Sequence, residues 1–331
     1  MSSQMQAVMY TQYGSPDVLQ IEAIDKPVPA DNEVLIRVYA TTVGAVDAIF
    51  RRGKNFSARL FTGLLKPKLT RPGGEFAGEI VDVGNAVTRF KAGDSVFGTM
   101  APNFGAHAEY ICMPEDGAMI LKPDSMTYEE AVAFHPGALT ALPNLREAAN
   151  VQSGQKVLIN GASGSIGTSA VQLAKYFGAE VTGVCSGANV ELVKSLGADA
   201  VIDYEQEDFT QTGQTYDVIF DTVGKRSFSE CKDSLKEGGI YLTTVITASI
   251  LPQMLWTSKF GSKKAKIVFA GLRPVGEKRK DLDFFLELVE IGALKPVIDR
   301  SYPLEKIAEA HRYVETGHKK GTVVITIGNR R

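Results

Sequence analysis

The sequence predicts an α/β protein in which a β-rich domain is interrupted by a doubly wound parallel-sheet domain. Short strand-like runs separated by glycine or aspartate turns fill the first part of the chain, a spacing typical of a barrel or sandwich. From Lys156 onward, apolar runs alternate with helical segments, which indicates a parallel sheet covered by helices on both faces. The length of 331 residues fits two domains, since a single core rarely grows beyond about 300 residues.

The β-rich part contains a series of predicted strands. Glu33–Ala40 alternates weakly between branched apolar and polar residues, as a half-buried strand does. A helix begins at Ser125–Tyr128, with Glu129 and Glu130 in its first turn, where the helix dipole favours acids. The predicted strands are Gln6–Tyr10, Leu19–Ala23, Glu33–Ala40, Ala77–Val83, Ser95–Thr99 and Ala108–Cys112.

The α/β part comes next, with predicted helices at Ile166–Phe177 and Asn189–Leu196 between its strands. These strands are Val157–Asn160, Val181–Cys185, Val201–Asp203, Val218–Asp221, Gly239–Val245 and Lys266–Ala270. The tail returns to mixed structure, with helices at Asp281–Ile291 and Leu304–Glu315 and a strand at Thr322–Ile327. We therefore expect residues 1–123 and 273–331 to form one domain and residues 124–272 to form the other.

Composition excludes several function classes. The net charge of −2 and the absence of a dominant basic block argue against a nucleic-acid partner. Three widely separated cysteines form neither a disulfide framework nor a metal-ligand spacing, and they fit a reducing compartment. Met1–Met9 lacks the features of a signal peptide, and the apolar stretch Ile240–Trp256 is too polar and too short for an integral membrane segment. We expect a cytoplasmic protein.

A glycine-rich turn between a predicted strand and a predicted helix carries the strongest chemical signal. The segment Gly161, Ala162, Ser163, Gly164, Ser165, Ile166 and Gly167 matches the dinucleotide-binding fingerprint Gly-x-Gly-x-x-Gly, except that Ala162 takes the place of the first glycine. Gly164 would let the backbone approach a pyrophosphate at the helix N-terminus, and Gly167 would let the helix pack closely on the strand. The alternative is a tight turn without a ligand.

The end of the second strand of this part predicts the kind of nucleotide. An NAD site places an acid there to bind the ribose 2′-hydroxyl. Here Val181–Cys185 is followed by Ser186-Gly-Ala-Asn189, which contains no acid. Ser186 and Asn189 can donate hydrogen bonds to a 2′-phosphate, and Lys194 either adds positive charge or is a solvated helix residue. The pattern favours NADPH.

An ordered series of motifs resembles the medium-chain dehydrogenase/reductase superfamily, and most of all its zinc-free branch of quinone oxidoreductases (zeta-crystallin-like). The matching segments are Pro72–Gly78, Val87–Gly98, Gly105–Tyr110, Gly161–Gly167, Leu196–Tyr204, Tyr216–Gly224, Ala310–Val314 and Gly321–Ile325. The resemblance implies a GroES-like substrate domain and a Rossmann cofactor domain. It also implies a homodimer, in which strands near Lys266–Ala270 extend the Rossmann sheet edge to edge.

The resemblance also implies roles for single residues. Tyr204 would lie by the adenosine end of NADPH, and Thr140, with Asp47 a predicted catalytic residue, would contact its nicotinamide end. Val223 and Asp221 match a strand end near the cofactor, where Asp221 can equally be structural. Asp47 is retained from an active-site loop that usually reads Asn-Pro-x-Asp, although Gly44 replaces its Asn.

The sequence lacks the zinc ligands of the superfamily's alcohol dehydrogenases. The position of the loop cysteine is taken by Ala45 or a neighbour, and Gly74 takes the place of the histidine of a Gly-His-Glu motif. The third ligand region, Phe134–Ala138, offers His135 but no cysteine, and there is no four-cysteine lobe. Zinc needs four clustered ligands, or three with water, so we predict no metal.

Without zinc to polarise a carbonyl, the least demanding chemistry is hydride transfer to a small hydrophobic quinone or α,β-unsaturated carbonyl, where the charge delocalises and solvent supplies the proton. The alternatives are an NADP-dependent alcohol or carbonyl dehydrogenase and a non-catalytic NADPH-binding scaffold or sensor. Asp47, Arg51 and His135 are candidate proton donors. Phe56–Lys68 and Ile250–Phe260 are either lids or ordinary packing segments.

Overall fold

The computed structural model describes residues 3–54, 56–247 and 249–328 and divides into two compact units. Unit 1 comprises Met1–His135, Leu272–Phe284 and Ile298–Arg331, and unit 2 comprises Pro136–Gly271 and Phe285–Val297. The chain passes between the units at four points, two of which fall inside the helices α3 (Tyr128–Leu142) and α8 (Val275–Glu290). The predicted domain ranges differ from these units, since they place residues 124–135 and Leu272 with unit 2 and residues 285–297 with unit 1.

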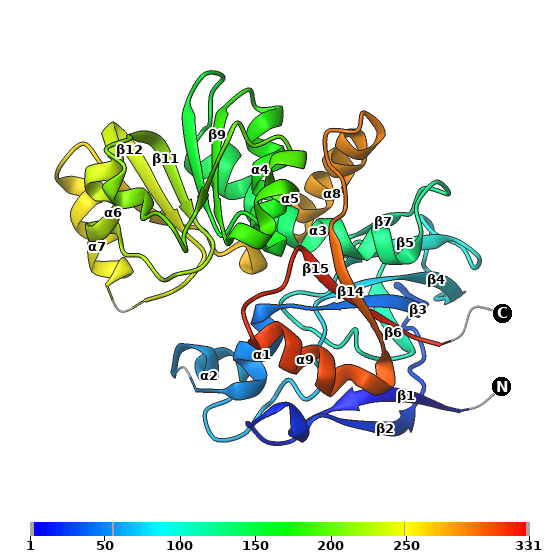
Figure 1. The fold of residues 1–331 in the computed structure, drawn as a ribbon. Helices are drawn as coiled ribbons and strands as arrows, with labels where there is room; N and C mark the ends of the chain where they lie inside the picture. The colour runs from blue at the N-terminus through cyan, green and yellow to red at the C-terminus, as the bar shows by residue number, and fades with distance from the viewer. Residues whose placement is uncertain (1–2, 55, 248, 329–331) are drawn as a thin grey trace. The chain divides into compact units, whose positions relative to one another are not determined.

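Unit 1 is built around a mostly antiparallel sheet in the order β14-β15-β3-β4-β5-β7, with β6 pairing β3 (Figure 1). The long strand β3 contributes to the core of this unit through Val34, Ile36 and Val38, which are at most 1% exposed. The strands are β3 (Glu33–Val43), β4 (Glu75–Val83), β5 (Ser95–Thr99), β6 (Tyr110–Pro114), β7 (Met119–Leu121), β14 (Ile298–Pro303) and β15 (Thr322–Thr326), beside a separate pair of β1 (Gln4–Met9) and β2 (Gln20–Asp25).

Unit 2 is a parallel sheet in the order β10-β9-β8-β11-β12-β13 (Figure 1). Its strands are β8 (Lys156–Asn160), β9 (Glu180–Cys185), β10 (Ala200–Asp203), β11 (Tyr216–Asp221), β12 (Leu235–Thr243) and β13 (Lys264–Ile267). From β8 the chain winds outward to β9 and β10, then returns to β11 and winds the other way. Parallel sheets that reverse in this manner bind ligands at the carboxyl ends of the strands beside the reversal. The predicted α/β class with a doubly wound parallel sheet is confirmed.

Helices cover the sheet of unit 2 on both faces, as right-handed crossovers in two directions require. In Figure 1, α4 (Ser165–Tyr176) and α5 (Val190–Ser195) lie on one side of the strands, and α6 (Phe228–Cys231) and α7 (Ile250–Lys259) lie on the other. None of the helices in the described part of the chain is long and apolar enough to cross a membrane.

Several elements differ from the prediction. The strands β7 and β14 were not expected, and β12 begins at Leu235, before the predicted start at Gly239. The helix α1 (Ala45–Arg52) was not expected, because it is too short to show a clear apolar period. The helix expected at Asp281 begins at Val275, just after Pro274, in a stretch whose charged residues hide the periodicity. The strand expected at Lys266–Ala270 is β13, which begins two residues earlier and ends at Ile267.

A fully buried arginine joins three segments of unit 1. Arg51, on α1, forms an ion pair with Glu315 on α9 (Ile307–Glu315) and donates to the carbonyl of Gly14 in an N-terminal loop. Its Nε also lies 3.4 Å from Nδ1 of His311, which is buried on α9. Burial lowers the pKa of Arg51 to about 10, but the paired guanidinium stays charged at neutral pH.

The buried Arg51–Glu315 ion pair should contribute far more to the stability of the protein than the exposed Arg52–Glu315 pair. We expect Arg51→Met to lower the free energy of unfolding by about 3 kcal/mol, because it leaves buried polar partners unpaired. Arg52 contacts the same Glu315 oxygen at 2.9 Å but is 42% exposed, so Arg52→Met should cost about 0.5 kcal/mol or less. Urea unfolding of both variants measures the difference. An equal loss of unfolding free energy in the two variants would contradict the larger contribution of the buried Arg51–Glu315 pair.

Candidate functional site

The turn between β8 and α4 in unit 2 has the geometry of a nucleotide-binding turn. Gly161 adopts a positive φ of 82°, which favours glycine. The backbone N–H groups of Gly161 and Ala162 both donate to the carbonyl of Val184 on β9, at 3.0 and 2.9 Å. Gly164 is the N-cap of α4, so the turn delivers the chain directly to a helix N-terminus, where orphan N–H groups and the helix dipole favour an anion.

The glycines of this turn are required for different reasons. A Cβ on Gly167 would lie 2.1 Å from the carbonyl oxygen of Gly161, and a Cβ on Gly161 would lie 2.5 Å from Val223 Cγ2. The protein itself therefore leaves no room for a side chain at either position. A Cβ on Gly164 would meet only one atom within 4 Å, the Gly161 oxygen at 3.5 Å. The fold does not need a glycine at 164, and this open position is where a phosphate would approach the backbone.

Ala162 replaces the first fingerprint glycine without disturbing the turn. Its side chain is fully buried, and it lies beside Gly183 on β9. A Cβ on Gly183 would be 3.0 Å from the Ala162 methyl group. The absence of a side chain at Gly183 therefore makes room for the methyl group, which explains why this departure from the fingerprint is tolerated.

Asn189 connects the glycine turn to the end of β9. Its side-chain amide donates to Ser163 Oγ at 3.2 Å and to Ser186 Oγ at 3.1 Å. Asn189 is 7% exposed, and its Oδ1 is buried without a hydrogen-bond partner among the described residues. A serine hydroxyl that accepts from Asn189 still carries a proton that it can donate. The structure thus brings together three of the predicted cofactor residues as a group of hydrogen-bonding side chains.

An acid that the sequence analysis did not consider lies beside this group. Asp203 ends β10, and the parallel register pairs it with Cys185 at the end of β9. A Cβ on Gly187 would lie 2.7 Å from Asp203 Oδ2, so the carboxylate packs against the loop that follows β9. Only the strand order reveals this neighbour, because Asp203 is well separated in sequence from Ser186. Its negative charge would act against a nearby phosphate.

The remaining predicted cofactor residues lie on elements around the turn. Val223 is 41% exposed and faces Gly161, whereas Tyr204 directly follows Asp203 and is 52% exposed. Thr140 is half-buried on α3. A Cβ on Gly137, one turn earlier in that helix, would lie 2.1 Å from the carbonyl of Ser165, so α3 packs against the first turn of α4.

Asp221 has a structural role at the carboxyl ends of three strands. Its buried carboxylate accepts hydrogen bonds from Asn160 on β8 at 2.9 Å, from the N–H of Val223 at 3.0 Å and from Tyr241 on β12 at 3.1 Å. Burial and the charge of Asp221 raise the pKa of Tyr241, so its hydroxyl stays protonated and donates. Asp221 therefore fixes the loop that presents Val223 to the glycine turn.

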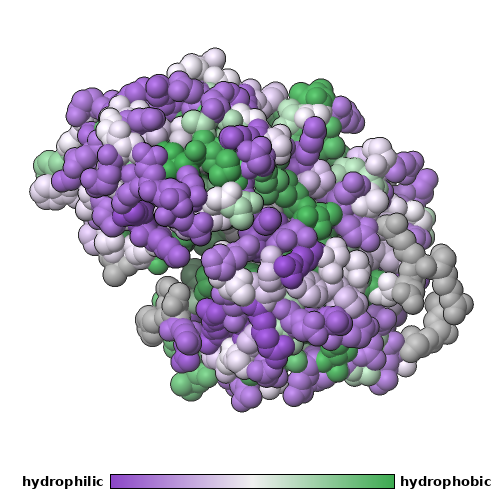
Figure 2. All heavy atoms as spheres, in the orientation of Figure 1, coloured by the Kyte–Doolittle hydropathy of each residue, from purple (hydrophilic) through white to green (hydrophobic). Residues whose placement is uncertain are grey.

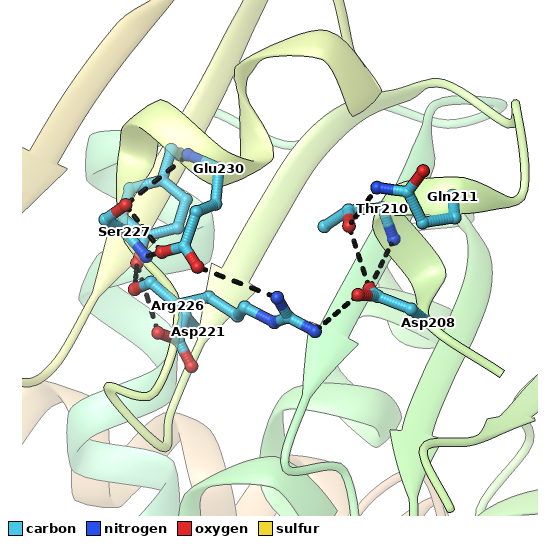
Figure 3. A network of polar contacts seen from close by, with 8 residues as sticks. Asp208, Thr210, Gln211, Asp221, Arg226, Ser227 and Glu230 are labelled. Carbon is cyan, nitrogen blue, oxygen red and sulfur yellow. Dashed lines mark hydrogen bonds and ion pairs between the residues drawn. The ribbon is translucent and has the colours of Figure 1, made fainter. Parts of the chain in front are cut away.

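A polar network continues from this loop (Figure 3). Arg226 forms ion pairs with Asp208 at 2.7 Å and Glu230 at 3.6 Å, and its carbonyl accepts from Tyr241 at 2.7 Å. Ser227 and Glu230 form a capping box at the start of α6. These groups are paired with one another, so the network stabilises the end of the sheet.

A pair of carboxyl groups lies in unit 1. Asp47 is 5% exposed and accepts from the backbone N–H groups of Gly44 at 2.8 Å and Gly73 at 3.1 Å. Glu75, at the start of β4, accepts from the Thr42 hydroxyl at 2.8 Å. Burial raises the pKa of Glu75 to about 7, and the negative charge of Asp47 adds to this effect. The sequence alone does not show that Glu75 has a raised pKa, because this depends on its burial and on the charge of Asp47.

Two candidate proton donors are already used inside unit 1. His135 is fully buried, with its ring nitrogens 2.9 Å from the carbonyl of Ala131 and 3.0 Å from that of Gly98. Burial lowers the pKa of His135 to about 4. Arg51 is held by Glu315, as described above. Within residues 3–54, 56–247 and 249–328, no group of three or more His, Cys, Asp or Glu side chains is arranged to hold a metal ion.

Comparisons with known proteins agree with this geometry. The family model "Alcohol dehydrogenase GroES-like domain" matches residues 30–124, and the model "Zinc-binding dehydrogenase" matches residues 196–325. The chain is 36% identical to the 2-methylene-furan-3-one reductase of Solanum lycopersicum, over 98% of this chain and 79% of the relative. It is 32% identical to the chloroplastic NADPH-dependent alkenal/one oxidoreductase of Arabidopsis thaliana, over 97% and 79%. The quinone oxidoreductase structure from Coxiella burnetii superposes with a TM-score of 0.87 at 29% identity, covering 98% of this chain and 100% of that one.

Two glycine substitutions separate the needs of the fold from those of a ligand. Gly167→Ala should lower the free energy of unfolding by about 2 kcal/mol or more, because its methyl group meets backbone atoms. Gly164→Ala should leave stability unchanged but weaken NADPH binding at least about tenfold, because its methyl group occupies the phosphate approach. Thermal unfolding and cofactor fluorescence measure the two effects. Unchanged NADPH affinity in Gly164→Ala would argue against a phosphate at this turn.

The raised pKa of Glu75 predicts a pH-dependent stability. Its folded value of about 7 lies above the ordinary 4.5, so the unfolded chain loses this proton first and stability falls as pH rises between these values. Glu75→Gln keeps an acceptor for Thr42 and removes the charge. Its stability relative to the native protein should therefore be higher at about pH 8 than at about pH 5. Urea unfolding tests this, with the exposed Glu22→Gln as control; a relative stability that is the same at both pH values would contradict it.

Proposed function

The chain belongs to the medium-chain dehydrogenase/reductase superfamily, and on this premise we propose that it is a zinc-independent, NADPH-dependent reductase that transfers hydride to quinones or α,β-unsaturated carbonyls. The observation that carries the cofactor assignment is the open position at Gly164 on a helix N-terminus, which the fold itself does not require. The names of the similar proteins support the acceptor class, since they are reductases of enones and quinones.

We assign the pyrophosphate of NADPH to the segment Gly161–Gly167, and the 2′-phosphate to Ser186 and Asn189. The buried, unpartnered Oδ1 of Asn189 fits an additional donor from the ribose, and the serine hydroxyls can donate to phosphate oxygens. Tyr204 is assigned to the adenosine end. The Asp203 carboxylate opposes the 2′-phosphate and would limit the preference for NADPH over NADH.

Val223 and Thr140 are assigned to the nicotinamide end. Asp221 acts as a positioning residue: Asn160 and Tyr241 donate to its carboxylate, which in turn accepts from the backbone N–H groups of Val223 and Gly224 and so fixes the loop. Asp47 is assigned as a catalytic residue of unit 1. Its carboxylate accepts two backbone hydrogen bonds, which hold Gly44 and Gly73 in place. The carboxylates of Asp221 and Asp47 already accept hydrogen bonds from neighbouring groups of the protein. Each therefore orders its surroundings, and solvent supplies the proton.

The bound cofactor supplies the hydride. An enone would receive it at its β-carbon. The electron pair of the C=C bond would then form the C=C bond of an enolate, the carbonyl π pair would move to oxygen, and a solvent proton would add at the α-carbon. A quinone receives hydride and a proton and becomes a hydroquinone. Because the enolate or phenolate delocalises its charge, these reactions depend less on a metal than the reduction of an isolated ketone does.

We also propose that the protein is cytoplasmic and homodimeric. Cys112, Cys185 and Cys231 are all free, as expected in a reducing compartment. β13 stands at one end of the strand order of unit 2, so it offers an edge that a second copy could extend.

The proposed activity is tested by mixing purified protein with NADPH and either 1,2-naphthoquinone or a simple enone. Oxidation of NADPH should depend on the protein and on the acceptor, and it should survive treatment with EDTA. Tight NADPH binding without turnover of any acceptor would argue for a scaffold or sensor instead. Loss of turnover in EDTA, with recovery on adding zinc, would overturn zinc independence.

Substitution at the end of β9 tests the cofactor preference. Ser186→Asp should weaken NADPH binding at least about tenfold through repulsion of the 2′-phosphate, and it should improve NADH binding by accepting from the 2′-hydroxyl. Asp203→Asn should do the opposite and strengthen NADPH binding. Fluorescence titration with both nucleotides gives the affinities. Equal effects of either substitution on NADPH and NADH would place the ribose elsewhere.

A further inference from the structure

One segment of unit 1 carries an unusual concentration of positive charge. Between Asp47 and Glu75 the sequence contains no acidic residue. The same segment, residues 48–74, contains the basic residues Arg51, Arg52, Lys54, Arg59, Lys66, Lys68 and Arg71. In the whole chain, by contrast, 36 basic residues are outnumbered by 38 acidic ones. The charge of this segment is therefore a local property that the net charge conceals.

The same segment exposes large apolar side chains. Leu60 and Phe61, on α2 (Phe56–Thr62), are 62% and 57% exposed, and Leu64 and Leu65 in the following loop are 52% and 93% exposed. We call these four residues, with the exposed Lys54, Lys66 and Lys68, the α2 patch. In Figure 2, hydrophobic spheres lie beside hydrophilic ones at the lower left, where Figure 1 shows α2. Contiguous exposed apolar side chains mark an interaction surface.

Residues 59–63 of the segment are anchored on their inner side by contacts with Tyr13 and Gly53. Thr62 is fully buried and lies 2.8 Å from the hydroxyl of Tyr13, which also donates to the carbonyl of Gly63 at 2.5 Å. Arg59 donates to the carbonyl of Gly53 at 2.6 Å and stacks over the Tyr13 ring. The turn that carries Leu64 and Leu65 is thus held in place while their side chains face outward.

We propose that the α2 patch docks on the surface of a membrane that contains anionic lipids. Lysines in the patch would meet negatively charged headgroups, and the leucine and phenylalanine side chains would enter the boundary between headgroups and acyl chains. Two features favour a lipid surface over a protein partner. Lysine is depleted in protein interfaces. The segment also contains no acid of its own, and Glu315 of α9 pairs with Arg51 and Arg52, so the lysines of the patch supply its exposed positive charge. The binding is peripheral, and it is independent of nucleotide and substrate.

The test is flotation of the full-length protein with vesicles, without nucleotide. The protein should float with vesicles of phosphatidylcholine mixed with phosphatidylglycerol, remain unbound with phosphatidylcholine alone, and be released by raised salt. Lys66→Gln and Lys68→Gln should each weaken binding about fivefold. Leu65→Ser should weaken it about tenfold, because it removes an apolar side chain from the bilayer.

Matched controls use exposed residues outside the patch. Val28→Ser removes an apolar side chain that is 85% exposed, and Lys280→Gln removes a charge from a side chain that is 75% exposed. Neither should change vesicle binding. Thermal unfolding should show that all the variants fold, since every substituted side chain is exposed.

Three results would overturn the proposal. The first is failure of the native protein to float with anionic vesicles at low salt. The second is an equal loss of binding in the control and patch variants. The third is a patch variant that binds vesicles normally but changes either the oligomeric state or the KM for a water-soluble quinone, which would make the patch a subunit interface or a substrate lid. Vesicle binding is measured without turnover, so failure of the proposed reductase activity would not affect this test.

Discussion

The close approach of α4 to the glycine turn is the constraint on which unit 2 depends. With a glycine at 167, the helix can begin against the carbonyl of Gly161, where a Cβ would come within 2.1 Å. This contact fixes the helix N-terminus at the carboxyl end of β8, beside the reversal of the strand order. The turn consequently exposes the backbone at Gly164, the one fingerprint glycine that the protein could replace without a clash.

Two side-chain arrangements support this turn from either side. Asn189 ties Ser163 to Ser186, and Asp221 ties the loop after β11 to Asn160 of β8. Asn189 and Asp221 each lie at or just after the end of a parallel strand. The register of the sheet therefore brings each of them close to its partners on the neighbouring strand ends. The candidate site is therefore assembled from several strand ends, each held by buried hydrogen bonds, before any ligand is present.

The sequence allowed the fold class, most strands and the glycine turn to be predicted, because each leaves a local signal of periodicity or spacing. It could not reveal Asp203 as a neighbour of Gly187, since this contact depends on the pairing of β10 with β9. Nor could it reveal the raised pKa of Glu75, which depends on burial and on Asp47. The positive charge of segment 48–74 can be found from the sequence alone. Its basic residues are spread out, however, so the segment stands out by its lack of acidic residues and contains no dense basic block.

The proposed reaction is the transfer of hydride from NADPH to an activated carbon–carbon double bond. The most direct measurement is to supply NADPH carrying deuterium at the nicotinamide C4 position, with each face labelled in turn, and to analyse the reduced enone by mass spectrometry and NMR. We expect one deuterium at the β-carbon from one labelled face, and a solvent-derived hydrogen at the α-carbon. A reduced product without cofactor deuterium from either face, or with deuterium at a carbonyl carbon, would contradict the proposed reaction.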